Sequence, residues 1–97
     1  AASNARYKGV LTMVDGDFSA AAGTWKDANG NTVTVSGNGQ FTVQSADGKT
    51  ANYSIASYSY TLDDGKYNAQ LSGQGSANLQ ITTGADGSVT SVVVTQP

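Results

Sequence analysis

Hydrophobic and polar residues alternate along most of this chain, in short segments bounded by turn-forming residues. In residues 31–36 and 40–45, Val or Phe occupies every second position, and Thr lies between them. Successive side chains of a strand point to opposite faces of a sheet, so this pattern is typical of antiparallel strands that bury one face. The alternation therefore predicts a protein built from β-strands.

Turn signals divide the segments at regular intervals. Gly, Asn and Asp accept the positive φ angles that tight hairpins need. Seven signals occur, at Asp15-Gly16, Asn29-Gly30, Asn38-Gly39, Asp47-Gly48, Asp64-Gly65, Gly73-Gln74-Gly75 and Asp86-Gly87. They predict about eight strands, over residues 6–14, 18–27, 31–36, 40–45, 49–62, 66–72, 76–83 and 88–95.

The lengths of the hairpin loops predict which residues lie opposite one another. A three-residue loop at 28–30 places Trp25 opposite Val33, and the next loops continue the same apolar face through Phe41 and Tyr53. A slip of one residue would turn these side chains to solvent. The agreement across several hairpins supports a single register.

The longest predicted strand, 49–62, changes its pattern midway. Tyr53 and Ile55 share one parity, whereas Tyr58 has the other. One extra residue would restore a single apolar face, so we expect a β-bulge near Ala56-Ser57 that also bends the strand.

Beyond this bulge, a two-residue turn at Asp64-Gly65 would pair Tyr60 with Ala69, and the turn at 73–75 would pair Ala69 with Leu79. The apolar face would then continue across the second half of the chain.

Two segments allow more than one interpretation. Residues 17–23 fit a strand with a bulge at Gly23, which we favour, or one helical turn with Asp17 as its N-cap and Gly23 as its C-cap. In the last strand, residues 92–94 are all Val and occupy both faces, which predicts a strand covered on both sides.

An apolar face that crosses so many strands must be buried against itself. We therefore predict an all-β fold, a single small antiparallel meander of about eight strands that forms a flattened up-and-down barrel or a two-sheet sandwich. Pairing of the first and last strands would protect the sheet edges. One domain is expected over residues 1–97, with residues 1–5 as a tail that is disordered or foreign to the natural protein.

The composition narrows the possible chemistry. With no Cys and no His, the chain lacks the usual ligands of zinc, haem and iron–sulfur clusters, and we expect no cofactor. Five basic residues against seven acidic ones predict no nucleic-acid partner. The sequence contains no apolar run of about 18 residues, which predicts no membrane span.

The acidic residues are explained by turns rather than by catalysis. All are Asp, and Asp63 and Asp64 are adjacent, so their side chains diverge, whereas a catalytic pair must converge on one substrate. Asp27, Asn29 and Asn31 imitate the start of a calcium loop, but the Gly and Glu that complete such a loop are missing. We predict neither an enzyme nor a metal site.

Aromatic residues are the best candidates for partner contact. We select Tyr7, Trp25, Tyr58 and Tyr60, because flat rings stack on sugars and anchor protein interfaces, and outward Asn and Gln side chains could add hydrogen bonds. The predicted register places all of them except Tyr7 on the inward face. Core packing with hydroxyl groups at the rim is therefore the favoured alternative.

Two short motifs carry a family resemblance. Gly23-Thr24-Trp25 resembles the G-x-W signature of lipocalin and avidin-like barrels, and Gly84-Ala85-Asp86-Gly87 is similar to a hairpin of bacterial biotin-binding proteins. The resemblance covers seven residues and implies a barrel that carries a ligand. In those families the signature opens the first strand, whereas here a predicted strand precedes it.

The leading hypothesis is a non-catalytic, exported bacterial domain at the cell surface or in the periplasm. It would be a binding or structural module with an unknown protein or glycan partner, exposed as an antigen and monomeric. The scarcity of Lys and Glu, with Ser, Thr, Asn, Gln and Gly in their place, supports export of a secreted chain after signal-peptide removal. The alternatives are a calycin-like carrier of a small apolar ligand and a small hydrolase inhibitor.

Overall fold

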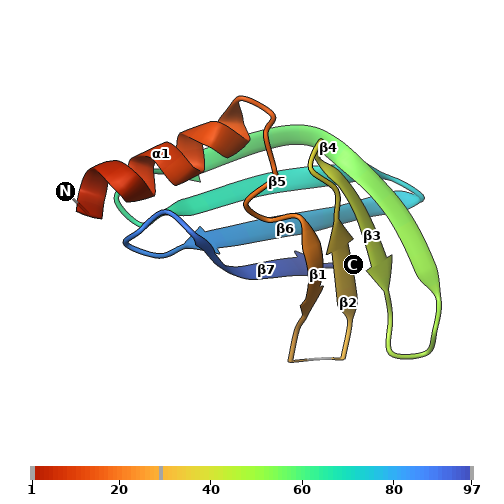
Figure 1. Cartoon of the computed structure of the whole chain (residues 1–97). Helices are drawn as coiled ribbons and strands as arrows, with labels where there is room; N and C mark the ends of the chain where they lie inside the picture. Colours follow the sequence, from red (N-terminus) through yellow and green to blue (C-terminus); the bar gives the residue numbers. More distant parts are fainter. Residues whose placement is uncertain (1, 29, 97) are drawn as a thin grey trace.

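Most of the chain forms one antiparallel sheet. The computed structural model describes residues 2–28 and 30–96. Helix α1 (Ala2–Val14) comes first, and the strands that follow are β1 (Gly23–Lys26), β2 (Thr32–Val35), β3 (Gln40–Gln44), β4 (Thr50–Thr61), β5 (Lys66–Gly73), β6 (Gly75–Thr83) and β7 (Val89–Thr95). The strands pair in sequence order, and the sheet curls into a nearly closed up-and-down barrel (Figure 1). The predicted all-β meander is confirmed.

The first predicted strand is wrong, because residues 6–14 belong to α1. Tyr7, Val10 and Val14 recur at helical spacing, i, i+3 and i+7, which outweighs the weak alternation in this segment. Val10 and Met13 are buried, and the helix packs against β5 and β6. An apolar helix face thus covers one end of the barrel, where an eighth strand was expected.

Hydrogen bonds fasten α1 to two turns of the sheet. Arg6 donates to the carbonyl oxygens of Asp63 at 3.2 Å and Gly84 at 3.4 Å. The Tyr7 hydroxyl donates to the Asp63 carboxylate. Helix α1 begins at Ala2 and therefore includes residues 2–5.

The segment between α1 and β1 is a compact turn. The Asp17 carboxylate accepts a bond from the Ser19 amide at 3.0 Å, and the Ala21 amide donates to the Phe18 carbonyl at 2.9 Å. This arrangement is close to the helical-turn alternative, and the favoured strand over 18–22 is wrong. Phe18 is buried by the turn, and Gly23 opens β1. The G-x-W motif therefore does open the first strand.

The predicted register holds across the first four strands. Trp25 lies opposite Val33, and Phe41 lies opposite Tyr53, as the loop lengths require. The expected bulge is confirmed between Ile55 and Ser57. The predicted turn at Asn29-Gly30 includes Asn29, which lies outside the described residues.

The register of β4 against β5 differs from the prediction by two residues. Tyr60 lies opposite Tyr67 rather than Ala69. The reason is a wider turn, in which the Gly65 amide donates to the Leu62 carbonyl at 3.1 Å. A register shift of two residues leaves every side chain on its predicted face. In the next hairpin, Ala69 lies opposite Leu79, as predicted.

The barrel is open between its first and last strands. In the described residues β1 pairs only with β2, and β7 pairs only with β6, so the expected pairing of the sheet edges is not found. Val92 and Val94 are buried, but Val93 is 38% exposed. The last strand is therefore covered on one side only, contrary to the prediction from its three Val residues.

The core lies between the two halves of the curled sheet. Its largest buried side chains come from α1 and from strands on both sides of the bend: Met13, Phe41, Tyr67, Leu71 and Ile81. These residues fill the inward face that the alternation predicted.

Candidate functional site

Three of the four predicted contact residues lie on α1 and β4. Tyr58 and Tyr60 project from the second half of β4. Tyr7 lies on α1 and reaches Asp63 in the turn that follows β4. Trp25 lies on β1, where it is half-buried and its Nε1 donates to the Ala21 carbonyl at 2.7 Å. Trp25 therefore packs against the core and fixes the turn before β1.

Five aromatic rings form a continuous series, which we call the aromatic row: Phe41, Phe18, Tyr67, Tyr58 and Tyr60. The Phe41–Phe18 and Phe18–Tyr67 pairs meet edge to face, with centroids 5.9 and 5.6 Å apart. Tyr67 and Tyr58 are stacked at 5.6 Å, and Tyr58 and Tyr60 at 6.4 Å. Both geometries are favourable for aromatic pairs, so each ring helps to hold the next in place.

The aromatic row runs from the core to the surface. Phe41, Phe18 and Tyr67 are buried, whereas Tyr58 is 49% exposed and Tyr60 is 44% exposed. The expectation that these two tyrosines are inward core residues is therefore corrected. Their parity is as predicted, but nothing in the described chain covers this stretch of the face completely. The row ends in two rings that are held by packing and yet open to a partner.

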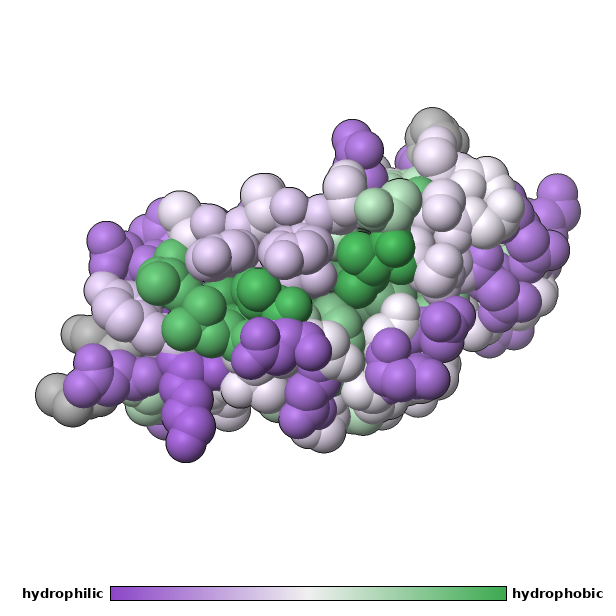
Figure 2. Space-filling model, turned by 90° about the horizontal axis from the view of Figure 1, so that it is seen from above, coloured by the Kyte–Doolittle hydropathy of each residue, from purple (hydrophilic) through white to green (hydrophobic). Residues whose placement is uncertain are grey.

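A further exposed hydrophobic residue lies on α1. Leu11 is 40% exposed, one helical turn after Tyr7. Figure 2, which looks down on the side of the molecule where α1 lies, shows hydrophobic side chains gathered among hydrophilic ones on this face. An apolar surface rimmed by polar residues is typical of an interaction site.

A surface hollow, which we call the mouth hollow, lies beside the aromatic row and has a volume of about 300 Å³. Its apolar and aromatic lining comes from Met13, Val14, Phe18, Ile55, Tyr58 and Tyr67. Its polar lining comes from Asn38, Gln40 and Ser54. None of the described side chains that line it is charged. Gly39 also borders it, with φ of +88°, and a Cβ there would lie 3.1 Å from the Phe18 ring.

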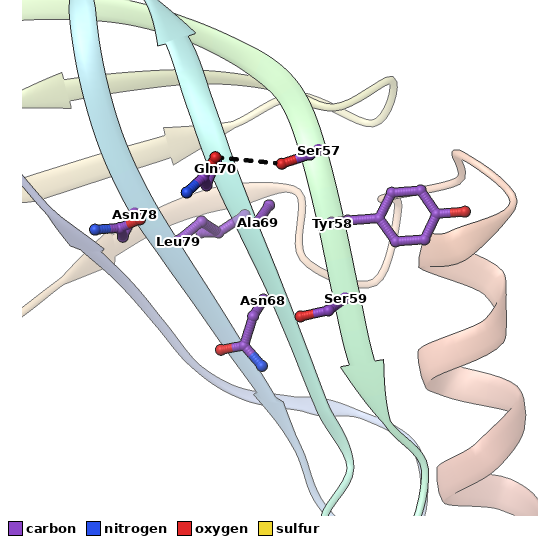
Figure 3. A pocket seen from close by; sticks show the side chains of 8 residues that line it. All are labelled: Ser57, Tyr58, Ser59, Asn68, Ala69, Gln70, Asn78 and Leu79. Carbon is purple, nitrogen blue, oxygen red and sulfur yellow. Dashed lines mark hydrogen bonds between the residues drawn. The ribbon is translucent and has the colours of Figure 1, made fainter.

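A second hollow lies on the opposite face of the sheet. This outer-face hollow of about 470 Å³ is bordered by hydroxyl and amide side chains: Ser57, Ser59, Asn68, Gln70 and Asn78. Figure 3 shows these side chains on one side of the strands and the Tyr58 ring on the other, directed toward α1. The Ser57 hydroxyl donates to the Gln70 amide oxygen at 3.4 Å. The polar side chains around this hollow are thus all uncharged, as the alternation predicted.

Two tyrosine hydroxyls of the region have raised pKa values. Burial raises the pKa of Tyr67 to about 12, and the neighbouring Tyr58 adds to this effect. The hydrogen bond and negative charge of Asp63 raise the pKa of Tyr7. Both phenols are therefore protonated at neutral pH and can donate hydrogen bonds.

Several carboxylates accept hydrogen bonds in local turns. Asp27 accepts bonds from the backbone and side-chain amides of Asn31 at 3.0 and 3.2 Å, which accounts for part of the calcium-like pattern as a turn. Asn29, the middle residue of that pattern, lies outside the described residues. Within the described ranges, no group of three His, Cys, Asp or Glu residues is placed to hold a metal ion.

Sequence reasoning missed one exposed hydrophobic residue and two members of the aromatic row. Leu11 was assigned to a strand, although its spacing from Tyr7 is helical. Phe18 and Tyr67 were treated only as core residues, and no local signal places them between Phe41 and the exposed tyrosines. Contacts between distant segments create the aromatic row.

Comparison with known proteins identifies one family. The family model for a domain of unknown function, DUF6287, matches residues 6–95. Neither the curated proteins nor the solved structures gave a match. Within the part of the chain that the structure describes, no helix is long and apolar enough to cross a membrane.

Proposed function

This chain belongs to the DUF6287 family, a domain of unknown function, and we propose that it is a non-catalytic binding module of an exported bacterial protein. In this proposal the module contacts a protein or glycan partner through Tyr58 and Tyr60. One observation carries the proposal: the aromatic row ends in two tyrosines that are 49% and 44% exposed.

Stacking favours binding through these rings. Exposed side chains normally lose rotational freedom when a partner binds, which costs about 0.5–1.5 kcal/mol for each side chain that has many rotamers. Tyr58 is already stacked on the buried Tyr67 and on Tyr60, so its ring loses part of this rotational freedom when the chain folds. Less freedom is then left to lose when a partner binds. Tyrosine also combines a large apolar area with a hydroxyl group, and it is enriched among the residues that dominate binding energy.

The surface composition supports the proposed location. The chain contains no Glu and only five Lys and Arg residues, and its outer face presents Ser, Asn and Gln. Exposure of such a face to host or competitor molecules would also make the domain an antigen. We propose that the domain acts as a monomer.

A carrier function is the alternative with a specific observation in its favour, because Gly23-Thr24-Trp25 opens the first strand. A calycin-like carrier needs internal space for its ligand. Here Phe41, Tyr67 and Leu71 occupy the inward face. The mouth hollow lies at the surface, so we favour binding at the mouth over carriage inside the barrel.

Cosedimentation with purified bacterial cell walls tests the proposed function. The wild-type chain should sediment with the walls. The double variant Tyr58→Ala/Tyr60→Ala should lose most of this binding. Val93→Ala, at an exposed position of β7, is the matched control and should bind like wild type. Equal retention of all three proteins, or retention of none, would contradict the proposal. Circular dichroism must show that the double variant is folded.

A further inference from the structure

We propose that the free edge of β7 binds an extended segment of a partner polypeptide as an added antiparallel strand. This inference goes beyond the proposed function, because it concerns another surface and another mode of binding. The aromatic row reaches the surface on β4, whereas β7 is the last strand of the sheet (Figure 1). Segments that add a strand to a sheet are held mainly by main-chain hydrogen bonds.

The outer edge of β7 has no partner strand in the part of the chain that the structure describes. Only β6 pairs with β7 there, from Val89 to Thr95. In an antiparallel pair, the N–H and C=O groups of alternate residues point to the partner strand, and those of the residues between them point away. Every second residue of β7 therefore presents a backbone donor and acceptor at the open side of the barrel.

The topology explains why β1 does not close this edge. All six strand pairs are antiparallel, so successive strands reverse direction, and the first and seventh strands run in the same sense. Direct pairing of β1 with β7 would have to be parallel, which is slightly less stable per residue. A segment from outside the chain can run opposite to β7 and form the antiparallel pair that β1 cannot form.

A hollow of about 480 Å³, which we call the edge hollow, lies beside β7. Residues 93–96 border it on one side, and Asp27, Ala28 and Asn31 of the β1–β2 hairpin border it on the other. Neighbouring residues of a strand point to opposite faces of the sheet. A hollow that is bordered by both Val93 and Val94 therefore follows the edge of the strand, where an incoming segment would pair.

β7 lacks the features that protect sheet edges from other strands. Natural edge strands are commonly short, or they carry charged residues or Pro. β1 has only four residues, one of which is Lys26. β7 has seven residues, VTSVVVT, with neither a charge nor a Pro. Of the two edges of this sheet, the edge of β7 is the one suited to accept a strand.

Both ends of β7 are fixed by hydrogen bonds. Before the strand, the Gly84 amide donates to the Ser88 carbonyl at 2.8 Å. After it, the Gln96 side-chain amide donates to the Tyr53 hydroxyl at 2.8 Å. β7 is thus held extended before a partner arrives, which lowers the entropic cost of binding.

The side chains beside the edge indicate the chemistry of the partner segment. Val92 and Val94 are buried on the inward face, and Val93 is 38% exposed on the outward face. Side chains of an added strand would lie next to these residues on the same faces, where β-branched and aromatic neighbours are favourable. The segment that fits β7 is therefore extended, uncharged and rich in β-branched residues.

The peptide KTVTVTVTK is the probe for this edge, because it alternates Thr and Val and carries Lys only at its ends, for solubility. Amide hydrogen exchange of the full chain is followed by NMR with and without the peptide. In the free chain, alternate backbone amides of β7 should exchange fast, and saturating peptide should protect the same amides. A control peptide with N-methyl groups on its central backbone amides lacks those donors and should give no protection.

A nitroxide label at the N-terminus of the peptide tests the orientation. An added strand that is antiparallel to β7 places its N-terminus near the end of β7. The label should therefore broaden the NMR signal of Thr95 much more than that of Val89. Stronger broadening at Val89 would contradict the antiparallel arrangement.

Two variants distinguish the edge from the outer face of the sheet. Val93→Lys places a charge on the edge strand, a feature that deters strand addition, and should weaken peptide binding at least about threefold. Gln80 lies opposite Val93 on β6, so Gln80→Lys adds the same charge one strand away from the edge. This matched control should bind the peptide like wild type. Equal weakening in both variants would show that the peptide lies on the outer face.

The remaining outcomes separate this inference from the proposed function. Absence of protection in β7, or equal protection by the N-methylated peptide, overturns strand addition. Protection of β7 that increases with the concentration of the chain alone would show that a second copy occupies the edge, which overturns the assignment to a partner polypeptide. The variant Tyr58→Ala/Tyr60→Ala should bind the peptide like wild type, and Val93→Lys should still sediment with cell walls. Either proposal can therefore fail while the other stands.

Discussion

The two ends of the aromatic row contain similar residues in opposite environments. Phe41 and Phe18 are enclosed by the sheet and the turn before β1, whereas Tyr58 and Tyr60 are about half exposed on β4. Phe41, Tyr58 and Tyr60 belong to the same inward face of the curled sheet, and Phe18 packs against it from the turn before β1. The difference shows that the side of a sheet and the degree of burial are separate properties, and that only the second decides whether a ring is available to a partner.

The largest expected difference between the two ends is in stability. Phe41→Ala removes a buried aromatic side chain and should lower the free energy of unfolding by about 3–5 kcal/mol, because the cavity cannot collapse fully. Denaturant melting of the variant measures this loss. A cost below about 1 kcal/mol would contradict the burial of Phe41.

The position of α1 beside the exposed end depends on a close backbone contact. A Cβ on Gly9 would lie 2.4 Å from the carbonyl oxygen of Gly87. Gly9→Ala should therefore cost about 1–3 kcal/mol of unfolding free energy despite the better helix propensity of Ala. Gly37→Ala is the control, because a Cβ there meets nothing within 4 Å. Equal melting of the two variants would refute the packing of α1 on this turn.

Alkaline pH should weaken the middle of the aromatic row. The pKa of Tyr67 is about 12 in the folded protein, whereas an unfolded tyrosine titrates near pH 10. The stability that this difference contributes is complete below about pH 10 and is lost as the pH rises toward 12. Thermal melting between pH 9 and 12 should show a smaller decline for Tyr67→Phe than for wild type. Identical declines would contradict the burial of this hydroxyl.

The smallest effect on stability is expected at the exposed end. Tyr60→Ala removes a ring with one stacking partner in the row and should cost about 1 kcal/mol or less. A loss comparable to that of Phe41→Ala in denaturant melting would show that Tyr60 is a core residue. The comparison between the two ends would then fail.

The sequence predicted the register because hairpin geometry is local. The pairs Trp25 with Val33 and Phe41 with Tyr53 follow from the parity of apolar residues and the lengths of the loops. The bulge after Ile55 followed from the same parity. The helix over 6–14 was missed because the segment also shows a weak alternation. The helical spacing of Tyr7, Val10 and Val14 prevails because it lets the helix pack against β5 and β6.

The candidate site was only partly predictable. Tyr7, Tyr58 and Tyr60 were selected for their chemistry, but their exposure depends on how far α1 and the turn at 17–22 extend over the sheet. That coverage is a property of the tertiary structure. The mouth hollow likewise depends on Asn38 and Gln40 meeting Tyr67, residues that no local pattern connects.

Photo-crosslinking from the exposed end tests the central claim most directly. The photoreactive residue p-benzoylphenylalanine would replace Tyr60 in one sample and Val93 in another, and each chain would be irradiated on purified bacterial cell walls. The account predicts covalent adducts with wall components from position 60 and only background from position 93. Equal labelling from both positions, or labelling from position 93 alone, would contradict it.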